Sequence, residues 1–109
     1  MDAKTFGGIK RELLAKADAI ARSKRPGYTQ GNADVLHNFK ASAQRAGVTP
    51  MQAWQVQFDK QLLSIATKVK HPKLTQGETM ESRFADSINY LLLGYALMQD
   101  EAETATVTK

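Results

Sequence analysis

Apolar residues recur every three or four positions over long segments of the chain, and shorter polar segments with Pro or Gly separate them. An α-helix turns by about 100° per residue, so this spacing places the apolar side chains on one helical face. The pattern predicts four helices, over residues 5–23, 33–46, 50–69 and 78–100. The basic segment SKRPGYTQG, which contains Tyr28, is expected to form a loop because of its proline and glycines.

Capping residues mark several of these boundaries. Asn32 is a candidate N-cap for the second helix, and Gly47 is expected to end that helix. In GVTPMQAW, Thr49 is a candidate N-cap and Pro50 occupies the first helical position, where its missing N–H is not needed. The expected fold is therefore all-α, a four-helix bundle-like array in one domain over 1–100, with a flexible tail at 101–109.

The fourth predicted helix is apolar on every side between residues 88 and 98. Leu91 and Tyr95 project one way, together with Phe84, Ile88 and Leu92, and an opposite side carries Tyr90, Leu93 and Leu97. A helix that is apolar all round must be enclosed. We therefore expect a second copy of the chain to cover the Tyr90, Leu93 and Leu97 side, giving a homodimer or higher oligomer through this helix.

Composition narrows the possible functions. The 109 residues include no Cys, which excludes disulfides, zinc–thiolate sites and cysteine nucleophiles, and no segment approaches the ~20 apolar residues that a membrane span needs. The expected location is cytoplasmic. The net charge is +4, and residues 1–25 contain seven basic and three acidic residues. This excess fits either a surface for polyanions or a solvated helix face, and the second interpretation is the more ordinary one.

Few motifs carry chemistry. The chain has no phosphate-binding glycine loop and no dinucleotide fingerprint. His37, Lys40 and Gln44 share one helical face that could meet a phosphate, although their spacing alone favours simple exposure to solvent. Asp86 and Asn89 lie three residues apart at the edge of an apolar side. Such a pair either forms hydrogen bonds across an interface or holds a ligand, and the sequence leaves both alternatives open.

Five carboxylates are candidates for a Mg²⁺ site: Asp34, Asp59, Glu78, Glu81 and Asp86. The set is thin for metal-assisted hydrolysis of a pyrophosphate and adequate for binding one ion. Glu81 would be costly on the apolar side of its helix without a partner, and that partner is Arg83, Lys60 or a metal. For a metal site, the expected ligands are Glu81 and Asp86.

Three segments together resemble a known family. They are Tyr28 with NADVLHNFK, then GVTPMQAWQVQFDKQLLSI, and then ESRFADSINYLLLGYALM. In order and spacing, over roughly residues 10–100, they are similar to the small phage and prophage proteins called nucleotide modification associated domain 1. The resemblance implies an all-helical, oligomeric fold, similar in plan to the all-α NTP pyrophosphatases, and a role in nucleotide or modified-base metabolism in the host cytoplasm. It places polar site candidates at Asn32, His37, Asn38, Lys40, Lys60, Asp86 and Asn89.

One departure from the family pattern bears on catalysis. The family has a Lys-His pair where this chain has Lys60 and Gln61, and a glutamine cannot shuttle protons near neutral pH. Whether the chain is an enzyme therefore stays open. We expect a nucleotide-binding protein whose phosphate meets Lys40, Lys60 or the basic loop at Arg25, and whose base stacks on Tyr28 or Tyr90. Alternatives are a factor that sequesters a cyclic nucleotide signal or inhibits a host protein, and, less favoured, a DNA-binding module.

Overall fold

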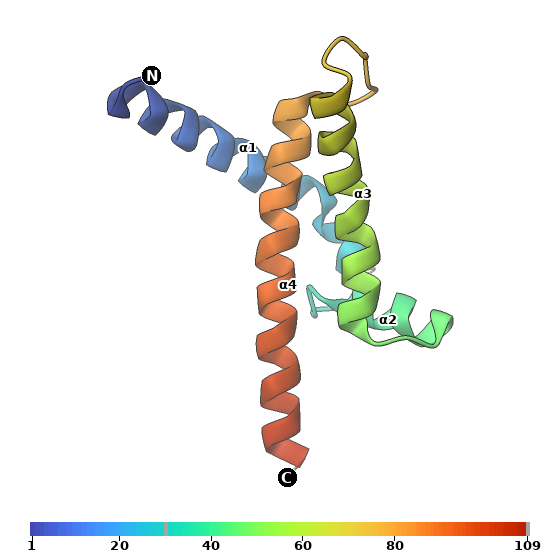
Figure 1. Cartoon of the computed structure of the whole chain (residues 1–109). Helices are drawn as coiled ribbons and strands as arrows, with labels where there is room; N and C mark the ends of the chain where they lie inside the picture. The colour runs from blue at the N-terminus through green and yellow to red at the C-terminus, as the bar shows by residue number, and fades with distance from the viewer. Residues whose placement is uncertain (30, 109) are drawn as a thin grey trace.

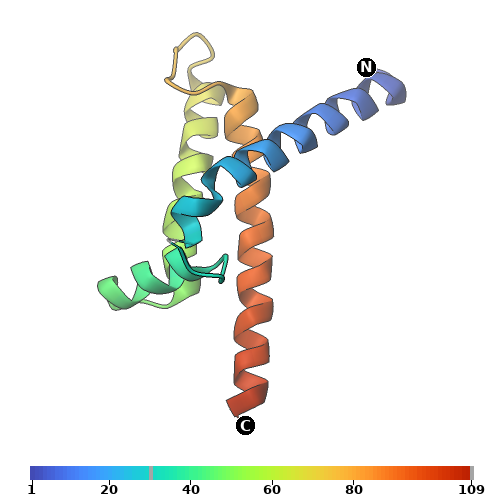
Figure 2. The same cartoon turned by 180° about the vertical axis from the view of Figure 1, so that it is seen from behind.

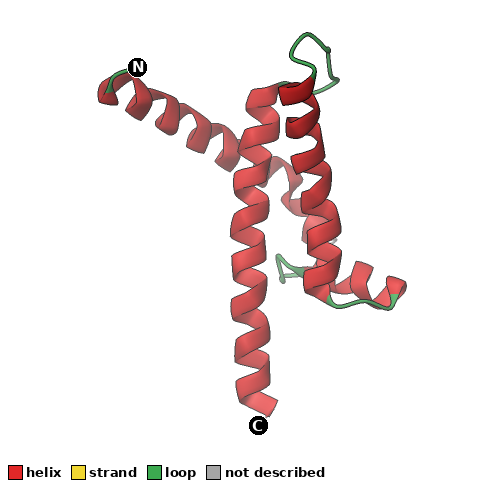
Figure 3. Cartoon of the chain, viewed as in Figure 1, coloured by secondary structure: helices red, strands yellow, loops and turns green. Residues whose placement is uncertain are grey.

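The computed structural model describes residues 1–29 and 31–108, without the side chains of residue 28 and residues 105–108. Within these residues the chain forms four α-helices and no strand (Figure 3), which confirms the all-α fold class. The helices are α1 (Ala3–Thr29), α2 (His37–Ala46), α3 (Pro50–Lys70) and α4 (Met80–Thr108).

Helix α1 is longer than its sequence pattern predicts. The prediction of a loop from residue 23 onward is wrong, because α1 continues through Pro26 to Thr29. A proline inside a helix removes one backbone hydrogen bond and bends the helix, at a cost of about 3 kcal/mol. Tertiary contact offsets this cost, since Lys24 forms an ion pair with Asp86 of α4 just before the proline. Figure 2 shows that α1 changes direction along its second half.

Helix α2 begins later than predicted. The backbone N–H of Asp34 donates to the side-chain oxygen Oδ1 of Asn32 at 2.9 Å, and the N–H of Leu36 donates to Oδ1 of Asp34 at 2.9 Å. Asn32 therefore closes a turn instead of capping a helix at residue 33. The helix ends as predicted at Gly47, whose φ of 70° is in the left-handed region that glycine adopts without strain.

Helix α3 follows its prediction closely. Thr49 and Gln52 form a capping box, in which each side chain accepts a hydrogen bond from the other residue's backbone N–H, and Pro50 occupies the first turn. Helix α4 extends to Thr108, eight residues beyond the predicted end at Asp100, so the segment expected to be a flexible tail is helical as far as residue 108.

Helix α4 packs against α1 and α3, and α2 packs against α3 and α1 (Figures 1 and 2). The buried core joins Leu36 and Phe39 to Tyr90 and Leu97 of α4. The expectation that a second copy covers the Tyr90, Leu93 and Leu97 side is therefore wrong. The same chain covers that side, and the Leu91 and Tyr95 side is the exposed one. Tyr90 is a core residue and does not offer a free ring face to a base.

The first part of α1 extends beyond the rest of the chain (Figure 1). We call residues 3–16 the α1 arm. Ala17 is buried and marks where α1 meets α4, whereas Phe6 and Ile9 on the arm are exposed. In the described part of the chain, no helix is both long enough and apolar enough to cross a membrane.

Candidate functional site

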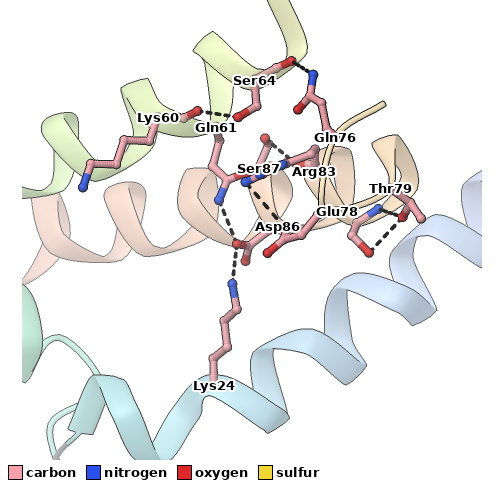
Figure 4. Close-up of polar contacts among 11 residues, drawn as sticks. Lys24, Lys60, Gln61, Ser64, Gln76, Glu78, Thr79, Arg83, Asp86 and Ser87 are labelled. Carbon is pink, nitrogen blue, oxygen red and sulfur yellow. Dashed lines mark hydrogen bonds and ion pairs between the residues drawn. The ribbon is translucent and has the colours of Figure 1, made fainter. Parts of the chain in front are cut away.

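Among the residues that the structure describes, Asp86 is the most buried polar or charged one, at 2% exposed. Lys24 of α1 places its ammonium Nζ 2.6 Å from Asp86 Oδ2, and Gln61 of α3 donates from Nε2 to the same oxygen at 3.0 Å. Figure 4 shows these side chains converging on α4 from two different helices. The three residues thus join α1, α3 and α4 at one point.

Asn89, one turn further along α4, is also buried and also bonded to α1. Its Nδ2 donates to the backbone oxygen of Ala17 at 2.8 Å. Asp86 and Asn89 therefore form hydrogen bonds between helices of one chain. Their role in holding a ligand stays a prediction. We call Lys24, Gln61, Asp86 and Asn89 the buried polar cluster.

Three buried polar atoms in and beside this cluster make no hydrogen bond in the described part of the chain: Asp86 Oδ1, Gln61 Oε1 and Arg83 Nε. A buried polar atom without a partner costs about 1–3 kcal/mol. A cluster optimised only for stability would be expected to pair these atoms. Buried polar atoms without a hydrogen bond are often found at functional sites, so we take the region of this cluster as the candidate site.

A cavity of about 170 Å³ lies beside the cluster, between α1 and α4. Its described lining is mostly apolar, with Val35 from the turn before α2, and two polar side chains, Arg25 and Asn89. Of these two residues Arg25 is exposed and Asn89 is buried. We call this the α1–α4 cavity; its remaining described lining residues are Ala21, Leu92 and Leu93.

A second polar group links the ends of α2 and α4. The ammonium of Lys40 lies 2.5 Å from Asp34 Oδ2 and 3.0 Å from Asp100 Oδ2. The hydrogen bond from Lys40, with help from the backbone N–H of Leu36, lowers the pKa of Asp34. The same bond from Asp34, with a weaker one from Asp100, raises the pKa of Lys40. Because two carboxylates already bind this ammonium, Lys40 is poorly placed to meet a phosphate.

The other predicted site residues lie apart from one another. Asn32 is exposed in the turn before α2, and His37 is half-buried at the start of that helix. Asn38 lines a separate hollow of about 330 Å³ with Ser23, Lys24 and Gly27. Lys60 is exposed on α3 and points away from Asp86 (Figure 4). The side chain of Tyr28 lies outside the described residues.

The two candidate metal ligands are also separated. Glu81 is exposed and 3.8 Å from Lys16, whereas Asp86 is buried against Lys24. Five residues apart on a helix, they project ~140° from each other. Among the described residues no three His, Cys, Asp or Glu side chains gather as a metal site would require. Glu81 and Asp86 therefore do not lie together in the described structure, and Mg²⁺ binding stays a prediction.

Sequence reasoning identified Asp86 and Asn89 but missed the residues that meet them. Lys24 was placed in a loop, and Gln61 was noted only as a departure from a family pattern. One signal could have found Lys24: it lies seven residues after Ala17, on the apolar stripe of α1. A lysine on an otherwise apolar stripe indicates a carboxylate opposite.

Comparison with known proteins identifies no family model that matches the chain, no similar curated protein and no similar solved structure.

Proposed function

We propose that this chain is a small nucleotide-binding protein that holds the base of its ligand in the α1–α4 cavity. The observation that carries the proposal is the lining of that cavity, which combines apolar walls with two residues that have polar side chains, Arg25 and Asn89. Ligand sites typically have this composition, a mostly apolar surface with a few polar groups that fix orientation.

The size of the cavity indicates which part of a nucleotide it would hold. Sites for whole drug-sized ligands measure about 300–1,000 Å³. At about 170 Å³ this cavity fits one flat ring system and leaves a sugar and its phosphates outside. Leu92 and Leu93 supply an apolar wall against which a base could pack.

Arg25 has the chemistry to bind the phosphate. A guanidinium presents a planar set of N–H donors that matches phosphate oxygens in pairs. Its neighbour Lys24 is engaged with Asp86, which leaves Arg25 as the cation at the described rim of the cavity. The excess of basic residues over 1–25 would raise the local concentration of anions.

Asn89 has the chemistry to orient the base. An amide NH₂ group has two hydrogens and an amide oxygen accepts two bonds, and the bond to Ala17 uses only one of these four positions. The remaining donor and acceptor suit the polar edge of a base. The described lining includes no carboxylate, imidazole or hydroxyl, so the proposal is for binding and sequestration rather than hydrolysis. The resemblance proposed from the sequence, to phage proteins associated with nucleotides, points to the same ligand class.

The test is isothermal titration of the full chain with AMP, GMP, CMP, UMP, their nucleosides and inorganic phosphate, with and without Mg²⁺. One monophosphate should bind more tightly than its nucleoside, independently of Mg²⁺. Arg25→Met should weaken that binding about 10- to 100-fold, which corresponds to one charge-assisted contact of ~1.5–3 kcal/mol. Arg11→Met removes the same charge from the α1 arm and should leave binding unchanged.

A second variant tests the cavity itself. Ala21→Leu fills the space between α1 and α4 with three further carbon atoms, so it should abolish binding while circular dichroism shows an intact helical fold. Equal nucleotide binding by wild type and Ala21→Leu would show that the site lies elsewhere. No binding of any monophosphate to the wild type at millimolar concentration would refute the proposal.

A further inference from the structure

An apolar stripe runs along the outer side of α4. Its members are spaced alternately four and three residues apart, which keeps them in line on one helix and is the spacing by which two helices pack together. They are Phe84, Ile88, Leu91, Tyr95 and Met98. The side chains of Leu91, Tyr95 and Met98 belong to residues that are 55%, 67% and 57% exposed. We call this set the α4 seam.

The α4 seam faces away from the helices that pack on α4. Asp86 and Asn89, which meet α1 and α3, project ~140–160° from Phe84 at about 100° per residue. Of the five seam residues Ile88 is half-buried and the other four are exposed.

The α1 arm has an uncovered apolar face as well. Phe6, Ile9 and Leu13 continue the stripe that α1 uses against α4 at Ala17. The arm touches α4 at its end, where Lys16 lies 3.8 Å from Glu81, and its first part extends away from the rest of the chain (Figure 1). Phe6 and Ile9 are exposed there. One chain thus leaves two apolar helix faces in water.

The chain exposes more surface than a compact monomer of its mass is expected to expose. The chain exposes 7746 Å². A folded monomer of 12.0 kDa is expected to expose about 6,000 Å². Its radius of gyration is 16.2 Å, against about 13 Å for a domain of 109 residues. The excess, roughly 1,700 Å², is more than the ~800 Å² that each partner buries in a standard protein interface.

We propose that a second copy of this chain docks antiparallel on the α4 seam, with its acidic α4 end beside the α1 arm of the first copy. Residues 99–104 contain Asp100, Glu101 and Glu103 and no basic residue, whereas residues 3–16 contain four basic residues and one acidic residue. Within one chain these segments lie far apart, since the two termini are at different ends of the molecule (Figure 1).

Charge decides between the two possible directions. A parallel pair would place the acidic end of one α4 against the acidic end of the other, where like charges repel. An antiparallel pair centred on Leu91 places Phe84 of each copy opposite Met98 of its partner. The same arrangement brings the acidic C-terminal end of each α4 towards the N-terminal end of the partner's α4. The basic α1 arm of the partner crosses α4 near that end. This interface is independent of the nucleotide proposal, because it uses the opposite side of α4 from Asn89.

The first test is the mass of the full chain in solution, measured by sedimentation at about 100 µM. The wild type should sediment as a dimer, twice the chain mass of 12.0 kDa. The double variant Leu91→Glu, Tyr95→Glu should sediment as a folded monomer. The matched control Val56→Glu, Leu63→Glu adds the same charge at equally exposed apolar positions of α3 and should remain a dimer.

Cross-linking tests the direction without depending on how a charged variant folds. The chain contains no Cys, so a single introduced thiol can react only with the same thiol of another copy. Leu91→Cys should form a disulfide dimer on mild oxidation. Phe84→Cys alone should not, but an equimolar mixture of Phe84→Cys and Met98→Cys should cross-link.

Several outcomes would overturn the proposal. They are a wild-type mass of one chain or of more than two chains, a dimer that survives the seam substitutions, and dissociation of the α3 control. Efficient cross-linking of Phe84→Cys with itself would overturn the antiparallel direction.

Discussion

The indole ring of Trp54 packs so closely on α4 that it leaves no room for a side chain at position 94. Its Nε1 donates to the backbone oxygen of Tyr90 at 2.7 Å, and the ring lies directly over Gly94. A Cβ atom at position 94 would lie 2.4 Å from Cζ2 and 2.5 Å from Cε2 of the ring. Only glycine lets the ring approach α4 so closely, although glycine is a poor helix former.

Gly94→Ala should therefore destabilise the fold. Displacing the ring costs about 1–3 kcal/mol and losing its hydrogen bond about 1 kcal/mol, against a gain of about 1 kcal/mol in helix propensity. We expect the free energy of unfolding, measured in urea, to fall by about 2 kcal/mol. The control is Gly8→Ala in α1, where the nearest atom to the new Cβ is the end of Arg11 at 3.9 Å, and which should be as stable as wild type or more so.

The lowered pKa of Asp34 makes a small part of the stability dependent on pH. Its folded pKa is below the unfolded value of about 3.9, so its contribution is present above that value and is lost as pH falls through the folded pKa. Asp34→Asn should lower the free energy of unfolding by less than about 1 kcal/mol at pH 7, because both partners are more than a third exposed and water screens them.

The difference in free energy of unfolding between wild type and Asp34→Asn should shrink as the pH falls below about 4, because wild type then also loses the ion pair. Urea midpoints at pH 7 and pH 3 measure this change. Asp59→Asn, at an exposed position of α3, should show no such convergence. A deficit that stays constant between the two pH values would show that the ion pair with Lys40 is not its cause.

The second half of helix α1 depends on tertiary contacts. Sequence rules end it near residue 23, because Pro26 and Gly27 are both unfavourable inside a helix. Those rules are local, whereas the bond from Lys24 to Asp86 spans 62 residues. Helix α3 shows the contrary case. Thr49, Pro50 and Gln52 specify its start through contacts within four residues, and the sequence therefore predicted it correctly.

The Lys24–Asp86 pair should show strong energetic coupling. Lys24→Met leaves a buried carboxylate with only Gln61 as a donor, at an expected cost of about 2–3 kcal/mol. Adding Asp86→Asn should recover part of that loss, and the double-mutant cycle should give a coupling energy of at least about 1 kcal/mol.

A matched control exists between the same two helices. Lys16 approaches Glu81 of α4 at 3.8 Å, with both side chains exposed by 41% or more. Lys16→Met should therefore cost less than about 0.5 kcal/mol. If Lys24→Met cost no more than Lys16→Met, the buried polar cluster would not be what holds α1 on α4.

For the whole molecule, the sequence showed that α4 is apolar all round but not which side the same chain covers. Leu91 and Tyr95 are as apolar as Tyr90 and Leu97, so periodicity alone cannot rank the two sides. Two contacts decide which side of α4 is covered. Trp54 of α3 packs on Gly94, and Phe39 of α2 packs with Tyr90 and Leu97. These contacts join residues 36 or more positions apart.

The candidate site, too, could be predicted only in part from the sequence. Asp86 and Asn89 were recognisable because polar residues at the edge of an apolar face need partners. Their partners Lys24 and Ala17 could not be identified before the path of α1 was known. The α1–α4 cavity was also beyond prediction, because it is formed by side chains from three separate segments around Ala21, Val35 and Asn89.

The position of Trp54 gives the chain an optical reporter of its own. It is the only tryptophan among 109 residues, and its indole is hydrogen-bonded inside the contact between α3 and α4. Separation of the two helices would expose the ring to water and shift its fluorescence to longer wavelength. Opening of this helix pair can thus be followed by emission, without a dye or an added label.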